Sequence, residues 1–439
     1  MNQLFVKVRD RKATVAVIGL GYVGLPLLLI LSQLRFKAIG IDKNKDKIAS
    51  LQKSKIDFLK NSPKAARLLR RNLKKKDFII TDEFSKIKKC DFIFIAVDTP
   101  IKKNKLPDQT NIKKAAIEIG RNLQKDAIVV IESTVSPGTT KNLVTPTIEK
   151  FSKLEGEIDF NVVVCSERIR PSKDAFEDMK QLPRVLGIST PKITPAVRGL
   201  YNLITTGDID VVDIITAEVV KTAENAFRDV KIAFANEIAL ICEEVNANVL
   251  KVRELVNKRY EREDMLLPGA GVGGHCLPKD PWLLLSAAKK NNLSVIPAAR
   301  KLNSYMPKHI SELILKSLNS QGIEPKNAKV AVLGISYIEN CEDTRNSPTK
   351  ELMEILDHKK IYLKIHDPYV TPYNNNSVED IVKDTDCLVL MVAHDQYKKI
   401  NLPRIYQIMR NKIIIDGRNF FNKTSAVKTG FLYKGVGNI

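Results

Sequence analysis

Cysteine is scarce in this chain, and its spacing excludes two common uses of the residue. Six cysteines are spread over 439 residues, and no two form a Cys-x-x-Cys pair. A disulfide framework or a zinc ribbon needs paired cysteines at close spacing. His275 precedes Cys276, but no second ligand follows at metal spacing. We therefore expect free thiols in a reducing, cytoplasmic setting and no metal site.

Aromatic residues are also few, which bears on the strong positive charge. They make up 6% of the chain, whereas the formal net charge is +21. The densest basic stretches, residues 60–76 and 86–89, contain no aromatic residue, although a nucleic-acid stacking surface would interleave the two. We expect a solvated lysine-rich surface that attracts anionic ligands, and no nucleic-acid partner.

Charge is absent from one long segment, Ala13 to Leu34. Its length would suffice for a membrane span. However, it contains a proline and three glycines at a characteristic spacing, and no signal-peptide cleavage pattern follows. A buried strand followed by a buried helix explains the segment better, so no membrane association is expected.

The glycines of this segment form a dinucleotide-binding fingerprint. Gly19, Gly21 and Gly24 follow a β-branched strand, 14–18, and precede an apolar helix. In such a turn the first glycine bends the chain, the second admits the pyrophosphate and the third allows helix–strand packing. Asp42 ends the next strand, where a carboxylate binds the adenosine ribose and repels the 2′-phosphate of NADP. The pattern predicts NAD as cofactor.

Strands and helices alternate further along the chain, and the opening pattern recurs. Strands are expected at 14–18, 36–41, 91–97 and 127–131, and a long helix at 213–246. Residues 328–337, 364–367 and 386–392 then repeat 13–22, 39–42 and 91–97 in outline, with Ser336 in place of Gly21. We predict an α/β protein with two Rossmann-like doubly wound parallel-sheet domains joined by a helical centre. The expected boundaries are 1–205 for the NAD-binding domain, 206–321 for the central helical domain and 322–439 for the second Rossmann-like domain.

A glycine-rich loop in the central part carries the most reactive side chain. Gly273 and Gly274 precede Cys276, Asp280 follows, and a helix is expected from Pro281 to Lys290. The glycines would let a bulky ligand approach the backbone, and a helix N-terminus favours a thiolate. The pattern indicates covalent catalysis rather than a buried structural thiol.

A second group of polar residues lies on the long helix. Lys221, Asn225 and Arg228 are spaced by four and three residues, which places them on one face. A solvated charged face is the ordinary explanation of such a trio. The neighbouring residues are mostly apolar, however, and a lysine in such surroundings acts as a general base or stabilises an oxyanion.

An NAD fold with a nucleophilic cysteine points to a four-electron oxidation of a primary alcohol through a thiohemiacetal and a thioester. Two other classes stay open. A β-hydroxyacid dehydrogenase shares the NAD domain and the helical lysine–asparagine pair but oxidises by two electrons. A non-catalytic protein that binds sugar nucleotides is the third class.

These motifs together resemble the UDP-glucose/GDP-mannose dehydrogenase family, the nucleotide-sugar 6-dehydrogenases. The resemblance spans nearly the whole chain and rests on these segments: Gly19–Gly24, Val97–Pro100, Glu132–Gly138, Gly273–Cys276, Asp343–Pro348 and Asp416–Arg418. It implies an N-terminal NAD domain, a dimer-forming helical centre and a C-terminal UDP domain, hence a homodimer or larger homo-oligomer that binds a UDP-sugar.

The resemblance also implies roles for individual residues. Cys276 would be the nucleophile and Lys221 the proton carrier and oxyanion partner, and Asn225, Asp280 and Glu167 would complete the catalytic set. The NAD-contacting positions would be Gly19, Gly21, Tyr22, Val23, Gly24, Asp42, Lys47, Thr99, Thr134 and Arg345. The substrate-contacting positions would be Arg168, Ile169, Lys221, Asn225, Arg228, Arg262, Gly273, Tyr337 and Arg418.

Within the family, several segments resemble the branch that oxidises UDP-N-acetylmannosamine to its uronic acid for glycan assembly. These are Ser166–Ile169, Glu224–Glu237 and Gly271–Trp282. UDP-N-acetylglucosamine and UDP-glucose remain alternative substrates. Two departures stand out: Ile338 occupies a position where the family usually has lysine, and 259–264 lacks the branch's histidine–proline pair.

Overall fold

The computed structural model describes residues 2–56, 63–170, 174–258, 265–288 and 292–439. They form two compact units, the first made of Met1–Glu224 with Trp282–Lys289 and the second of Asn225–Pro281 with Lys290–Ile439. The long helix α9, Ile214–Glu244, has residues in both units and agrees with the predicted helical stretch 213–246.

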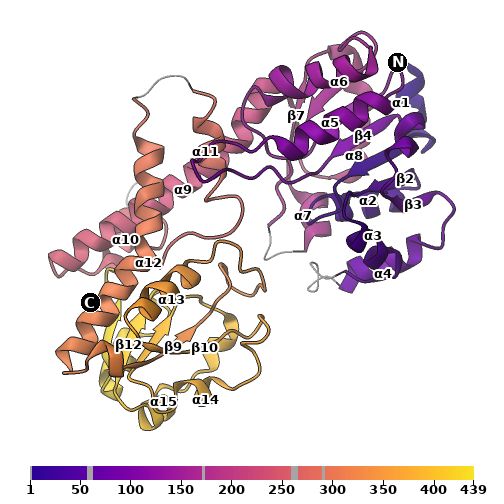
Figure 1. The fold of residues 1–439 in the computed structure, drawn as a ribbon. Helices are drawn as coiled ribbons and strands as arrows, with labels where there is room; N and C mark the ends of the chain where they lie inside the picture. The colour runs from indigo at the N-terminus through magenta and orange to yellow at the C-terminus, as the bar shows by residue number, and fades with distance from the viewer. Residues whose placement is uncertain (1, 57–62, 171–173, 259–264, 289–291) are drawn as a thin grey trace. The chain divides into compact units, whose positions relative to one another are not determined.

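The first unit contains an eight-stranded sheet in the order β3-β2-β1-β4-β5-β6-β7-β8. Helices of this unit pack around the sheet (Figure 1). β6 and β7 pair antiparallel, and the other neighbours are parallel. The strands are Thr14–Ile18, Lys37–Ile41, Phe78–Thr81, Phe92–Ile95, Ile128–Ile131, Asn161–Val164, Arg184–Ile188 and Ile209–Val212 for β1 to β8. The helices are Asn2–Arg9, Gly24–Gln33, Lys45–Gln52, Pro63–Asn72, Thr110–Asn122, Thr145–Ser152, Ala175–Gln181 and Thr194–Ile204 for α1 to α8.

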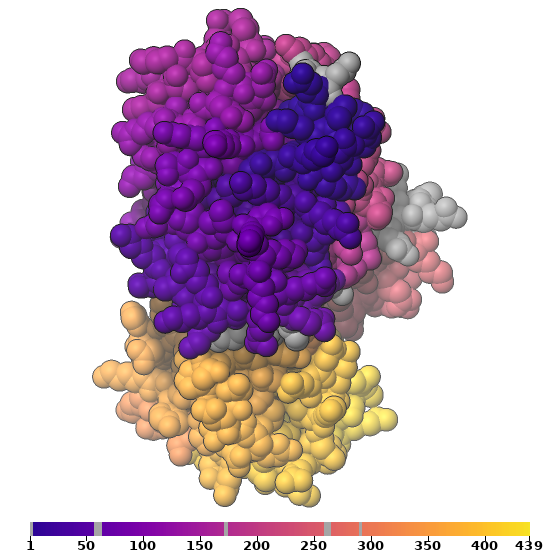
Figure 2. All heavy atoms as spheres, turned by 90° about the vertical axis from the view of Figure 1, so that its right-hand side faces the viewer, coloured from indigo at the N-terminus to yellow at the C-terminus, as the bar shows by residue number. Residues whose placement is uncertain are grey.

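The sheet is buried on both faces, which explains its continuous apolar strands. Val15 and Val17 of β1 enter one core, while Ala16 and Ile18 enter the core on the opposite face. The uncharged stretch 13–34 forms β1 and α2, as predicted, and no helix within the described residues is long and apolar enough to cross a membrane. Helix α1 lies at the surface of this unit, in indigo in Figure 2, with Phe5 against Gly199 of α8.

The second unit contains a five-stranded parallel sheet in the order β10-β9-β11-β12-β13. Its strands are Lys329–Leu333, Tyr362–His366, Cys387–Leu390, Ile413–Asp416 and Leu432–Gly435 for β9 to β13. The helices of this unit, besides part of α9, are α10 Val249–Lys258, α12 Val295–Ser320, α13 Pro348–His358, α14 Val378–Val382, α15 Leu402–Ile408 and α16 Lys423–Thr429. The order places a topological switch point between β9 and β11, and doubly wound sheets bind ligands at the carboxyl ends of strands there. The predicted fold class is confirmed.

Candidate active site

The fingerprint turn after β1 has the geometry that its glycines predict. A Cβ at Gly19, where φ is +93°, would lie 2.4 Å from the Ala96 carbonyl oxygen, and one at Gly24 would lie 1.8 Å from the Gly19 carbonyl oxygen. A Cβ at Gly21 would meet nothing within 4 Å. Gly19 and Gly24 are therefore needed for the turn itself, whereas Gly21 keeps the approach to the backbone open, as a pyrophosphate requires.

Asp42 lies directly after β2 and is tied to the fingerprint turn. Its carboxylate accepts hydrogen bonds from the Leu20 N–H at 2.9 Å, the Asn44 N–H at 2.9 Å and Lys47 Nζ at 2.8 Å. Burial alone would raise the pKa of Asp42, but Lys47 and the two N–H groups outweigh it and lower the pKa. Asp42 is thus held ionised beside the turn, which suits a ribose hydroxyl and disfavours a 2′-phosphate.

The other expected NAD-contacting residues of this unit lie at the same edge of the sheet. Tyr22 and Val23 occupy the turn directly before α2. Thr99 and Thr134 follow the parallel neighbours β4 and β5, and the Thr99 hydroxyl donates to the Thr134 carbonyl at 2.6 Å. The residues fit a bound NAD on the carboxyl side of the strands, where such sheets bind dinucleotides.

Glu167 belongs to a buried cluster of charged residues. Arg184, at the start of β7, forms an ion pair with Glu167 at 3.0 Å, and both side chains are at most 5% exposed. Nearby, Tyr201 donates a hydrogen bond to Glu132 at 2.5 Å. Burial raises the pKa of Glu132 to about 7, although Arg184 and Tyr201 pull it down. The buried guanidinium of Arg184 thus lies near two carboxyl groups, and the raised pKa of Glu132 lets that group keep a proton close to neutral pH.

Two expected substrate residues lie beside Glu167. Arg168 pairs with Glu224 of α9 at 2.7 Å and donates to the Pro183 carbonyl at 3.3 Å. The Ile169 N–H donates to the Glu167 carboxylate. The arginine is therefore held by a partner on α9.

The trio on α9 is not a uniform solvated face. Lys221 is 8% exposed, Asn225 is half-buried and Arg228 is exposed. Not all of the neighbouring apolar residues are buried around the trio, since Phe227 is 66% exposed. In the second unit, Asn225 Nδ2 donates to Asp280 Oδ2 at 2.6 Å. Asp280 is fully buried, and Lys279 Nζ lies 3.2 Å from its other oxygen.

Cys276 differs from every other cysteine of the chain because it alone is exposed. Its carbonyl accepts hydrogen bonds from the N–H groups of Lys279 at 3.0 Å and Asp280 at 2.8 Å, which forms a tight turn. The following helix, α11, spans Asp280–Leu285 and ends earlier than the predicted Lys290. The Ala287 and Ala288 N–H groups bond three residues back, which closes the helix, and Lys289 and Lys290 lie outside the described residues.

Gly273 and Gly274 lie in close contact with other residues of the second unit. A Cβ at Gly273 would lie 2.6 Å from the Asn346 carbonyl oxygen, and one at Gly274 would lie 2.7 Å from the Tyr337 ring. The glycines therefore make room for the protein's own Tyr337 and Asn346 on the side where a Cβ would lie. The Gly274 N–H also donates to the Arg345 carbonyl at 2.9 Å.

The remaining expected residues lie mostly in the second unit. Arg345 forms a two-pronged ion pair with Asp343, and Arg418 Nε donates to the Met391 carbonyl at 2.8 Å. Arg262 lies outside the described residues. Among the residues that the structure describes, no group of three or more His, Cys, Asp or Glu side chains could hold a metal ion.

The structure brings together two groups of residues that were not predicted from the sequence. Arg184 and Tyr201 support Glu132 and Glu167, and an arginine at the head of an otherwise apolar strand was the available signal. His394 contacts Asp367 at 3.1 Å, and both side chains are fully buried. The chain has only five histidines, and this one lies in the segment that follows the end of β11 at Leu390.

Models of the UDP-glucose/GDP-mannose dehydrogenase family match three parts of the chain: the NAD binding domain at 13–205, the central domain at 215–305 and the UDP binding domain at 331–423. The chain is 34% identical to the UDP-N-acetyl-D-mannosamine dehydrogenase of Pyrococcus horikoshii over 96% of this chain and 99% of that one. A solved structure of UDP-D-ManNAc dehydrogenase from the same organism has a TM-score of 0.90, with 97% and 99% coverage. An NDP-N-acetyl-D-galactosaminuronic acid dehydrogenase from Methanosarcina mazei is 30% identical with a TM-score of 0.84, covering 100% and 98%. The chain therefore belongs to the UDP-glucose/GDP-mannose dehydrogenase family and is an NAD-dependent nucleotide-sugar dehydrogenase.

Proposed function

We propose that this protein oxidises the C6 hydroxyl of UDP-N-acetylmannosamine to a carboxylate, with Cys276 as covalent nucleophile. The observation that carries the mechanism is that Cys276 is the one exposed thiol and that its carbonyl accepts the N–H of Asp280, whose buried carboxylate is bonded to the half-buried Asn225. The choice of sugar rests on relatives whose names specify UDP-N-acetyl-D-mannosamine and that are 32–34% identical to this chain.

The proposed reaction balances over two oxidations. NAD supplies the hydride acceptor when bound. Lys221 takes the proton of the C6 hydroxyl as the carbon loses a hydride, which leaves an aldehyde. The Cys276 thiolate adds to the aldehyde carbon, and loss of a second hydride converts the thiohemiacetal to a thioester. Water attacks the thioester, the C–S bond breaks, and the thiolate returns. One alcohol and one water thus yield a carboxylate, two hydrides and three protons.

Other residues would bind or orient the reacting groups. Asn225 and Asp280 would hold the oxyanion or the attacking water, because their own hydrogen bond fixes both side chains. Glu167 would assist that water, with its charge held by Arg184. For the sugar nucleotide we propose contacts with these positions: Arg168, Ile169, Arg228, Arg262, Gly273, Tyr337 and Arg418. Arg345 would join the NAD-contacting set, and the domain boundaries 1–205, 206–321 and 322–439 remain our proposal.

The test is a substrate panel with an NADH count. Purified protein is incubated with NAD and UDP-N-acetylmannosamine, UDP-N-acetylglucosamine, UDP-N-acetylgalactosamine or UDP-glucose. We expect the highest kcat/KM for the first and two NADH per sugar oxidised. The galactosamine derivative is included because of the Methanosarcina mazei relative. One NADH per sugar would support two-electron chemistry instead, and no turnover of any of the four would support a binding protein.

We also propose a cytoplasmic homodimer formed through α9. Apolar side chains recur on this helix at seven-residue spacing and stay exposed: Phe227 at 66%, Phe234 at 52% and Ile241 at 52%. A repeat of this period forms a continuous seam on a helix, as in helix pairing. Light scattering should give a dimer for the natural protein and a monomer for Phe234→Glu; an unchanged mass for that variant contradicts the proposed seam.

A further inference from the structure

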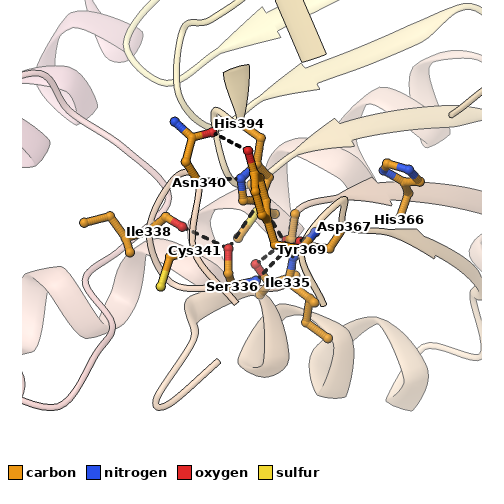
Figure 3. Close-up of polar contacts among 12 residues, drawn as sticks. Ile335, Ser336, Ile338, Asn340, Cys341, His366, Asp367, Tyr369 and His394 are labelled. Atoms are coloured by element: carbon orange, nitrogen blue, oxygen red, sulfur yellow. Dashed lines mark hydrogen bonds and ion pairs between the residues drawn. The ribbon is translucent and has the colours of Figure 1, made fainter. Parts of the chain in front are cut away.

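A buried histidine, His394, lies at the topological switch point of the second sheet. There the chain leaves β9 into a loop of residues 334–346, hereafter the switch loop. Asp367, directly after β10, accepts the N–H groups of Ile335 at 2.8 Å and Ser336 at 2.9 Å. His394, which follows β11, lies against the same carboxylate (Figure 3). Asp367 thus repeats the arrangement of Asp42, which accepts the Leu20 N–H in the first sheet.

The hydrogen bonds determine which ring nitrogen of His394 carries the proton. The Asn340 N–H donates to Nδ1 at 2.9 Å, so Nδ1 has no proton. Nε2 therefore carries the hydrogen and donates to Asp367 Oδ2 at 3.1 Å. Ser336 Oγ, 3.3 Å from Nε2, donates instead to the Ile338 carbonyl at 2.9 Å. His394 consequently connects a strand end to the middle of the switch loop.

Ile338 takes part in this cluster through its backbone. Its backbone carbonyl is the atom used by the cluster, and its side chain points away from His394 (Figure 3). Asn340 has a φ of +55°, a conformation that few residues other than glycine and asparagine adopt readily. Its N–H is directed at His394 only while this turn is kept, so the His394 bond holds a backbone conformation and not merely a side chain.

The far end of the switch loop packs on the residues around Cys276. Asn346 Nδ2 donates to the Gly274 carbonyl at 2.9 Å, and the Arg345 carbonyl accepts the Gly274 N–H at 2.9 Å. The Tyr337 ring fills the space beside Gly274. The loop Gly271–Cys276, hereafter the cysteine loop, is thus bonded to the switch loop from both directions. A change in the switch loop should reach the cysteine loop through these contacts.

We propose that His394 is a positioning residue for Cys276: by fixing the turn at Asn340, it holds the switch loop that in turn holds the cysteine loop. The proposal rests on the nucleophile role given to Cys276 above and adds a residue that never contacts the sugar. Its connection to the thiol consists of hydrogen bonds and packing within the second unit.

Two substitutions of His394 separate positioning from general support. The side-chain oxygen of asparagine reaches the place of Nδ1, so His394→Asn keeps the bond to Asn340 and loses the bond to Asp367. The side-chain nitrogen of glutamine reaches the place of Nε2, so His394→Gln keeps Asp367 and loses Asn340. Each variant loses one buried hydrogen bond, and a merely structural role would affect both alike.

The measurement is the rate at which iodoacetamide alkylates the native protein, read by mass spectrometry of the Cys276 peptide. The other five cysteines are buried and should react slowly. We expect His394→Gln to alkylate about tenfold faster and to turn over about tenfold more slowly, because one buried hydrogen bond is worth roughly that factor. His394→Asn should stay within about twofold of the natural protein in both measurements.

Controls keep the result interpretable. His366→Gln alters another histidine of the same unit, bonded to Tyr397 and directed away from the cluster (Figure 3), and should alkylate at the natural rate. Asn346→Gly removes the direct bond to Gly274 from an exposed position and should reproduce the faster alkylation, even if the His394 variants fold poorly. Equal rates for the Asn and Gln variants, or unchanged alkylation in Gln and Asn346→Gly, would overturn the proposal. Alkylation needs no turnover, so a failure of the proposed sugar oxidation would appear separately in the substrate panel.

Discussion

Glu132 should make the stability of the first unit depend on pH with an unusual sign. Burial raises the pKa of this carboxyl from 4.5 to about 7. Between these values the folded protein holds a proton that the unfolded chain has released, so stability falls as pH rises through the window. Most carboxylates act in the opposite sense: the pKa of Asp42, for example, is lowered, and its contribution is lost only as pH falls through that lowered value.

The magnitude follows from the shift. Each unit of pKa difference is worth 1.36 kcal/mol, so the ionisation of Glu132 should lower the free energy of unfolding by about 3 kcal/mol between pH 4.5 and pH 8. The substitution Glu132→Gln removes the ionisable group and keeps an oxygen that accepts the Tyr201 hydroxyl. Over that pH range, we expect the free energy of unfolding of the variant to rise by about 3 kcal/mol relative to that of the natural protein.

The assay is urea unfolding at several pH values, followed by tryptophan fluorescence. The chain has one tryptophan, Trp282, which belongs to the first unit and so reports on it. Glu155→Gln, at an exposed position of the same unit, is the matched control and should give no such trend. Parallel stability curves for Glu132→Gln and the natural protein would refute the reasoning, because other titrating groups cancel in the difference.

Three further predictions concern the cofactor turn and the nucleophile. Gly24→Ala should lower the free energy of unfolding by about 3 kcal/mol or more, because its Cβ clashes with the Gly19 carbonyl, whereas Gly21→Ala should fold normally but bind NADH at least about tenfold more weakly. Urea unfolding measures the first effect and NADH fluorescence titration the second. Equal stability of the two variants would contradict the turn geometry. Asp42→Asn should reduce the preference for NAD over NADP by about tenfold, measured as the ratio of kcat/KM values, and an unchanged ratio would count against its role at the ribose. Cys276→Ser should stall before release of the acid, and normal carboxylate production in a product assay by mass spectrometry would exclude the thiol as nucleophile.

The sequence determined features that depend on neighbouring residues. Alternating strands and helices predicted the parallel sheets, because apolar periodicity and turn residues act over a few positions. The Gly19–Gly24 spacing predicted a turn whose clashes are now measurable, and the likeness of 328–337 to 13–22 predicted a second strand and turn of the same kind. The end of α11 at Leu285 was missed, since local apolar character continued past the point where three-residue bonds close the helix.

Only the tertiary structure decided which side chains that are distant in the sequence form hydrogen bonds with one another. Glu132 and Tyr201 are 69 residues apart, and His394 is 54 residues from Asn340, yet both pairs are hydrogen-bonded in the interior. From the sequence alone, nothing indicated that Tyr337 and Asn346 pack against Gly273 and Gly274. Burial and long-range partners set the pKa of a carboxyl and the orientation of an imidazole, and neither is encoded in local spacing. Residue types thus determined the chemistry available to this protein, and packing determined which groups hold its protons and support its thiol.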